Sequence, residues 1–153
     1  MLKKKLPAFT MIEIVIVIAI FTVLLVLFLP IATQQFTANR VKTSASSMSS
    51  DVYVYQQKAY NRIDGESYGV SFGTNTYTLF TGTSLGAGTN LVIVDLAQNV
   101  TISNVNLDDA SNEIVFSPGD LEPSTFGTIT MTDGSTSYNL DVNAEGLIDT
   151  YKL

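Results

Sequence analysis

The sequence contains no cysteine and no histidine among its 153 residues. These absences exclude disulfides, zinc sites built on Cys or His, and the Ser/His/Asp and Cys/His arrangements of many hydrolases. Charged residues make up only 14% of the chain, against about 25% in an average soluble domain. The formal net charge is −6, although Lys3, Lys4 and Lys5 stand together near the start. We therefore expect an acidic body that repels nucleic acid.

The remaining residues offer little for catalysis or metal binding. The glycine-rich segment 82–88 lacks the Gly-Lys-Ser/Thr of a phosphate-binding loop, which favours a flexible turn. The acidic residues are scattered mostly in predicted turns and show no paired carboxylates. Two loops hold oxygen ligands that suit calcium, but neither has the spacing of an EF-hand. The first loop contains Asp108, Asp109 and Glu113, and the second contains Asp141, Asn143, Glu145 and Asp149. We expect solvated turn acids, no cofactor, no catalytic residue and no enzymatic activity, with calcium as the alternative.

A long apolar run lies near the N-terminus, from Ile14 to Ala32, and it contains no charge. As a helix it would span roughly 28 Å, close to the ~30 Å hydrocarbon core of a bilayer. The lysines before it place the N-terminus in the cytoplasm, so the rest of the chain would lie outside the membrane. A secretory signal peptide has a shorter apolar stretch. Glu13 stands at the edge of the run, where burying a carboxylate in the membrane is costly. We therefore treat Glu13 as a candidate functional residue.

The segment 3–20 resembles the class III leader of type IV prepilins and pseudopilins. In that family a short basic leader ends in a small residue, and a prepilin peptidase cuts there and methylates the new terminal amine. The resemblance implies cleavage between Ala8 and Phe9 and methylation of Phe9, with Ala8 standing where glycine is usual. Glu13 then becomes the fifth mature residue, where the family has its characteristic glutamate. Pro30 lies where the family often has a proline.

The resemblance also implies a structural role. The chain would be a major or minor subunit of a type IV pilus, a type II secretion pseudopilus or a competence pilus. Its partners would be copies of itself or sister pilins, the peptidase, an inner-membrane assembly platform and, before assembly, membrane lipid. A terminal ammonium at Phe9 would be costly to bury alone, and Glu13 of a neighbouring subunit can neutralise it. Pro30 removes one backbone hydrogen bond and loosens the helix.

After Pro30 the pattern stays helical but becomes amphipathic. The apolar residues recur at spacings of three and four, and they are Val41, Ala45, Met48, Val52, Tyr55 and Ala59. One apolar stripe on a polar helix predicts packing against a sheet. We expect a helix over 9–62, ended by Asp64-Gly65.

Beyond Gly65, short β-branched and aromatic runs alternate with turn residues. The predicted strands are 68–72, 76–80, 91–94, 99–105, 113–116, 128–132, 137–142 and 147–151. Asp133-Gly134 predicts a tight turn. The expected fold is α+β, with an antiparallel sheet packed on the long helix. Its parts would be the leader 1–8, the transmembrane and assembly helix 9–32, its amphipathic continuation 33–63 and the β-domain 64–153.

The β-domain resembles H-type minor pseudopilins and fimbrial T-type minor pilins, on the segments 68–72, 77–80, 114–119, 127–131 and 138–149. Two alternatives to a plain filament subunit remain open. One is a signal-anchored extracytoplasmic binding module that does not polymerise. The other is a DNA-binding minor pilin of a competence system. Some T-type relatives use an arginine-bearing motif after the last glycine, whereas Gly146 is followed by Leu147-Ile148-Asp149, so we expect nucleic acid not to be a partner.

Overall fold

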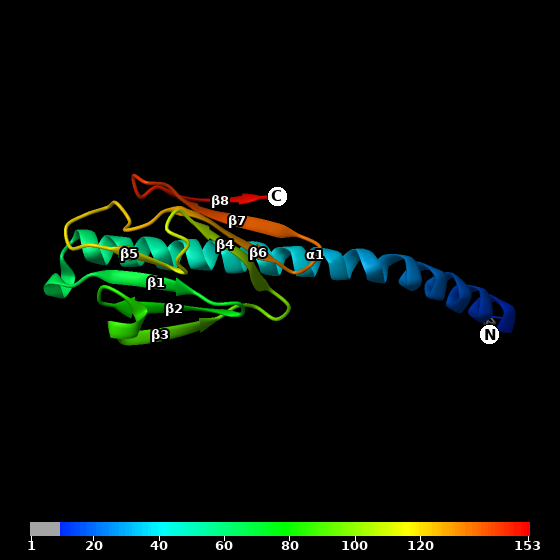
Figure 1. Cartoon of the computed structure of the whole chain (residues 1–153). Coiled ribbons are helices and arrows are strands. Elements are labelled where there is room, and N and C mark those ends of the chain that lie inside the picture. The colour runs from blue at the N-terminus through cyan, green and yellow to red at the C-terminus, as the bar shows by residue number, and fades with distance from the viewer. Residues whose placement is uncertain (1–9) are drawn as a thin grey trace, which may run out of the picture. The chain divides into compact units, whose positions relative to one another are not determined.

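Figure 1 shows the computed structural model of the chain, which describes residues 10–153, with side chains for 10–26 and 39–153. The α-helix α1 runs from Met11 to Tyr60, close to the predicted 9–62. The described residues 10–36 belong to one compact unit, and Thr37–Leu153 form a second. Each unit is considered by itself below.

The C-terminal half of α1 carries the predicted apolar stripe, and its six residues are all buried: Val41, Ala45, Met48, Val52, Tyr55 and Ala59. They form one core cluster with residues of both sheets, including Val70, Phe116, Ile129 and Leu140. The interpretation of this half as a helix that packs on β-structure is confirmed. After Tyr60 the chain turns through the 3-10 helix η1, Ile63–Gly65, in which Asp64 and Gly65 have φ values of 56° and 69°.

The first sheet contains four antiparallel strands in the order β3-β2-β1-β5. These strands are β1 (Tyr68–Phe72), β2 (Thr76–Thr81), β3 (Thr89–Asp95) and β5 (Glu113–Phe116). The 3-10 helix η2, Leu85–Ala87, lies in the predicted glycine-rich turn between β2 and β3. The pairing of β1 with β5 joins segments that are distant in the sequence.

The second sheet has the order β4-β6-β7-β8 and is also antiparallel. Its strands are β4 (Thr101–Leu107), β6 (Gly127–Thr132), β7 (Ser137–Val142) and β8 (Ile148–Lys152). Both sheets lie against the C-terminal half of α1 (Figure 1).

The α+β class is confirmed, and one detail of the prediction is wrong. The single expected sheet is two sheets, because β1 pairs with β5 while β4 pairs with β6. A tight turn joins β6 to β7 at the predicted Asp133-Gly134, where the Asp133 amide donates to the Thr136 carbonyl at 3.3 Å and Thr132 pairs with Ser137. The side chain of Asp133 also accepts hydrogen bonds from the amides of Ser135 and Thr136 and so holds this turn in place.

Candidate functional site

The residues of the predicted leader and cleavage site lie outside the part of the chain that the structure describes. They are Lys3, Lys4, Lys5, Ala8 and Phe9. Pro30 lies within the span of α1, but its side chain also lies outside the described part. Glu13 is therefore the one predicted site residue whose surroundings can be described. It stands in the first turn of α1.

Glu13 and Thr10 form a reciprocal cap at the start of α1. The amide of Thr10 donates to Oε2 of Glu13 at 2.9 Å, and the Thr10 hydroxyl donates to the same oxygen at 2.9 Å. In return, the amide of Glu13 lies 3.4 Å from the Thr10 hydroxyl oxygen. This is a capping box, which satisfies amide groups that have no partner within the helix. Sequence reasoning missed it, although the Thr-x-x-Glu spacing at 10–13 is its signal.

The helix that follows exposes apolar side chains without interruption. Every residue from 10 to 26 is exposed, and Glu13 is the only charged residue among them. Because consecutive helical residues point in all directions around the axis, this segment presents an apolar surface on every side. Among the residues that the structure describes, no helix meets the length and hydropathy needed to cross a membrane.

The predicted transmembrane segment 9–32 is therefore not confirmed. Phe9 and the side chains of residues 27–32 belong to that prediction and lie outside the described part of the chain.

Two polar side chains fasten the β-domain to the C-terminal half of α1. Asp51 accepts a hydrogen bond from the hydroxyl of Tyr77 on β2. Gln56, only 3% exposed, donates from its Nε2 to the carbonyl oxygens of Leu121 at 2.8 Å and Gly146 at 2.6 Å. These two carbonyls belong to loops that are far apart in the sequence. Sequence reasoning did not predict this role of Gln56, which depends on non-local contacts.

In the first of the two loops considered for calcium, the acidic side chains bond to neighbouring loop residues. Asp108 accepts hydrogen bonds from the Thr125 hydroxyl and, at 3.1 Å, from the Phe126 amide. Hydrogen bonds to Thr125 and Phe126 hold the pKa of Asp108 below its ordinary value. Asp109 accepts from the Ser111 amide at 2.8 Å. Within residues 10–153, no three acidic side chains gather closely enough to hold a metal ion.

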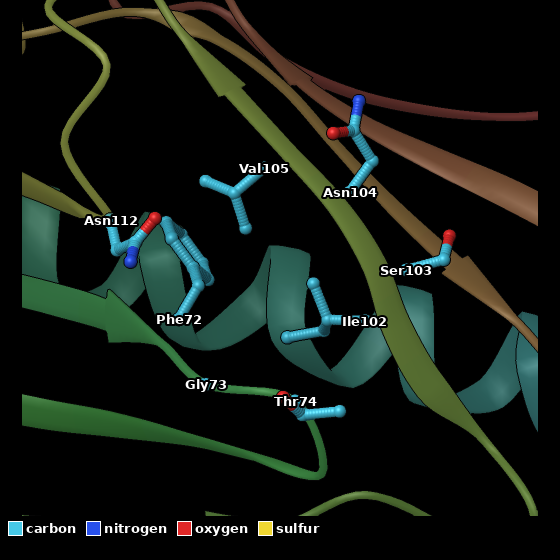
Figure 2. Close-up of a pocket in the computed structure, with 8 residues that line it drawn as sticks. All are labelled: Phe72, Gly73, Thr74, Ile102, Ser103, Asn104, Val105 and Asn112. Atoms are coloured by element: carbon cyan, nitrogen blue, oxygen red, sulfur yellow. The ribbon is translucent and has the colours of Figure 1, made fainter.

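A groove of about 310 Å³ lies beside β4, where the two sheets diverge (Figure 2). Ile102 and Val105 point toward Phe72, whereas Ser103 and Asn104 point to the other side of β4. A register shift between Ile102 and Asn104 separates these two directions. The other lining residues are Gly73, Thr74 and Asn112. Since no acid or base lines the groove, it offers polar contacts but no proton-transfer chemistry.

No protein-family model matches the chain, and neither a curated protein nor a solved structure matches it.

Proposed function

We propose that this chain is a structural subunit of a type IV pilus-like filament, which could be a pilus, a type II secretion pseudopilus or a competence pilus. In this proposal a prepilin peptidase cuts between Ala8 and Phe9 and methylates Phe9. The first half of α1 then leaves the bilayer and packs into a bundle with copies of itself or with sister pilins. The β-domain stays on the extracytoplasmic side, and an inner-membrane platform drives assembly.

The observation that carries this proposal is the exposed apolar surface of residues 11–26. Thirteen of its large apolar side chains are between 44% and 88% exposed. A helix that is apolar on every side needs lipid or other helices around it, because water disfavours such a surface. The β-domain in Thr37–Leu153 has its own closed core, so the need for a partner falls on this segment.

The capping box supports a defined place for Glu13 in the assembled bundle. Both hydrogen bonds from Thr10 end on Oε2 of Glu13. We assign the other carboxylate oxygen to the methylated ammonium of Phe9 in a neighbouring subunit. A buried ammonium and a buried carboxylate are each costly alone and stabilise one another when they meet. The cap would hold the carboxylate at a fixed position for that contact.

The test is the intact mass and N-terminal sequence of the full chain, extracted from membranes of cells that also express a prepilin peptidase. A product that begins at Phe9 and is heavier by one methyl group supports the proposal. A product that still begins at Met1 would favour the anchored module that does not polymerise. Cleavage near Ala32 would indicate a secreted protein, and either of these two results would overturn the filament proposal. The matched control is the same expression without the peptidase.

A further inference from the structure

Four strands lie at the edges of the two sheets, and two of them, β4 and β5, bond to other segments of the chain on their outer sides. β3 carries a register shift near Asn90, whose φ is 51°, but beyond it pairs regularly with β2 and exposes Val92 and Ile93. β4 also has a register shift, and the amide of Ile102 on β4 donates to Thr74. β5 is covered by Pro123 and Ser124, since the Ser124 amide donates to Val115 at 2.7 Å. Shifts and covering segments of this kind prevent an edge from pairing with another chain.

The fourth edge, β8, lacks these protections. It pairs regularly with β7 from Tyr138 opposite Lys152 to Val142 opposite Ile148, and no other strand of the described chain pairs with it. It contains no proline and a single lysine. Large apolar side chains stand exposed along it, namely Leu147 at 68%, Tyr151 at 44% and Leu153 at 66%. β8 is therefore an edge at which another strand can add.

The direction of the free backbone groups of β8 follows from its bonds to β7. The Leu153 amide donates to the Ser137 carbonyl, and the Leu147 carbonyl accepts from the Asn143 amide. Alternate residues of a strand direct their backbone groups to opposite edges. Ile148, Thr150 and Lys152 therefore direct their amides and carbonyls outward. In agreement with this, the Thr150 amide does not bond to β7 but donates to the adjacent Asp149 carboxylate at 2.7 Å, a bond that an added strand would replace.

We propose that β8 is an interaction surface for β8 of a second copy of this chain, paired antiparallel about a twofold axis at Thr150. In this register the outward-directed residues of the two strands meet, with Thr150 opposite Thr150 and Ile148 opposite Lys152. The alternate residues, whose side chains lie on the opposite face of the sheet, also match, with Leu147 opposite Leu153 and Asp149 opposite Tyr151. An isologous contact of this kind uses the same surface on both copies.

The side chains select this register over its neighbours. Shifting the axis by one position toward the N-terminus would place Asp149 opposite Asp149, and like charges directly opposite one another are destabilising. The opposite shift would pair Asp149 with the apolar Leu153. In the proposed register the Tyr151 hydroxyl can donate to Asp149, because its oxygen accepts from Asn139 at 3.2 Å and its own proton is still available.

The pairing has a geometric consequence. A twofold axis that relates antiparallel strands stands perpendicular to the sheet, so the two strands run in opposite directions. β8 extends alongside the C-terminal half of α1 (Figure 1), and these helical segments of the two copies would therefore also run in opposite directions. Subunits of one filament share a single direction. The contact would therefore join subunits of two different filaments, and its formation does not depend on filament assembly.

The absence of cysteine makes the register directly testable. We would prepare the full chain in mild detergent as two variants, Leu147→Cys and Leu153→Cys, with tags of different size. In the proposed register residues 147 and 153 of the two copies lie about 4.5 Å apart between Cα atoms, within disulfide range. Two copies of residue 147 lie roughly 20 Å apart, as do two copies of residue 153. Each variant alone is therefore the matched control.

On mild oxidation we expect the mixed disulfide to form at least about tenfold faster than the disulfide of either variant alone. This result would establish both the edge and the register. Equal rates in the mixture and in the single variants, whether fast or slow, would overturn the proposal. The disulfide rates are measured in detergent without a peptidase. A negative result would therefore not count against the filament proposal.

A second substitution tests the contact between Tyr151 and Asp149. Tyr151→Phe, added to both cysteine variants, should slow the mixed disulfide roughly tenfold, since each copy loses a hydrogen bond to a carboxylate. Tyr60→Phe is the control, because Tyr60 is similarly exposed and lies on α1. An unchanged rate in Tyr151→Phe, with the folded state verified by circular dichroism, would overturn this register.

Discussion

The hydroxyl of Tyr77 donates a hydrogen bond of 2.5 Å to Oδ2 of Asp51 and so connects β2 to α1. Tyr77 is only 1% exposed. Burial raises the pKa of the phenol, and the bond to Asp51 and its negative charge raise it further. The phenol therefore keeps its proton through the neutral pH range and acts as the donor. One helical carboxylate thus holds a strand of the first sheet in place.

Removing this carboxylate should destabilise the β-domain. Asp51→Ala leaves the buried Tyr77 hydroxyl without its acceptor, and we expect the free energy of unfolding to fall by about 1–3 kcal/mol. Urea unfolding of the full chain in mild detergent, followed by circular dichroism, measures this change. The control is Asp95→Ala, because Asp95 is exposed at the end of β3. An equal loss in both variants would contradict the role of the Asp51–Tyr77 bond.

Two glycines provide a matched pair for testing the loop that Gln56 holds. Gly146 and Gly134 have similar positive φ values of 80° and 90°. A Cβ at Gly146 would collide with the Leu121 carbonyl and with Gln56 Nε2, whereas a Cβ at Gly134 meets nothing. Both alanine variants carry the same backbone strain. We expect Gly146→Ala to lower the free energy of unfolding by roughly 1–3 kcal/mol more than Gly134→Ala.

The measurement is again urea unfolding of the full chain, with both variants run under the same conditions. Equal effects of the two substitutions would mean that the loop moves away from α1 at little cost. In that case the two hydrogen bonds of Gln56 would contribute little to the stability of the β-domain.

Much of the β-domain could be predicted from local sequence. The strands 68–72, 113–116 and 137–142 have the predicted bounds, because alternating side chains and turn residues mark the ends of strands. The buried stripe of α1 was predicted from its spacing in the same way. The division into two sheets was not predicted, since the pairing of β1 with β5 depends on contacts between distant segments. The role of Gln56 was missed for the same reason.

The candidate site was predicted less completely. The Thr10–Glu13 cap has a local signal in the spacing of a hydroxyl and a carboxylate, and sequence reasoning overlooked it because it assigned Glu13 to assembly alone. The free edge of β8 has no local signal, since it depends on which strands of the same sheet remain unpaired.

The two roles of Glu13 can be separated by two substitutions. Glu13→Gln removes the charge but keeps an oxygen that can complete the capping box. Glu13→Ala removes both. If the carboxylate neutralises a neighbouring terminal ammonium, both variants should incorporate poorly into filaments while the peptidase still processes them. The measurement is the fraction of subunit in sheared filaments relative to membranes. Normal incorporation of Glu13→Gln together with poor incorporation of Glu13→Ala would assign the residue to capping alone.

Two aspartates in loops, Asp108 and Asp133, predict a loss of stability at low pH. The folded chain holds the pKa of Asp108 and that of Asp133 below their ordinary values, through hydrogen bonds from Thr125 and Phe126 and from Thr136 and Ser135, respectively. The folded state therefore binds fewer protons than the unfolded state near these pKa values. This contribution to stability is complete above the unfolded pKa of about 4 and is lost as the pH falls through the lower folded values.

We expect the urea midpoint to be level from pH 7 to pH 5 and to fall steadily from pH 4 to pH 2. Thr125→Val removes the largest cause of the lowered pKa of Asp108, so its midpoint should depend less steeply on pH below 4. A midpoint in the parent chain that does not change across this range would contradict the assignment.

The hydrogen bonds of Gln56 can form only late in the synthesis of the chain, because their acceptors are made long after Gln56. Gln56 lies on α1, but its acceptors at Leu121 and Gly146 are 65 and 90 residues further along the chain. β8, which completes the second sheet, comes later still. A nascent chain therefore presents the stripe of α1 uncovered while the ribosome adds most of the β-domain. Both bonds of Gln56 can form only after Gly146 has left the exit tunnel, so the loops at Leu121 and Gly146 are fastened to α1 late in synthesis.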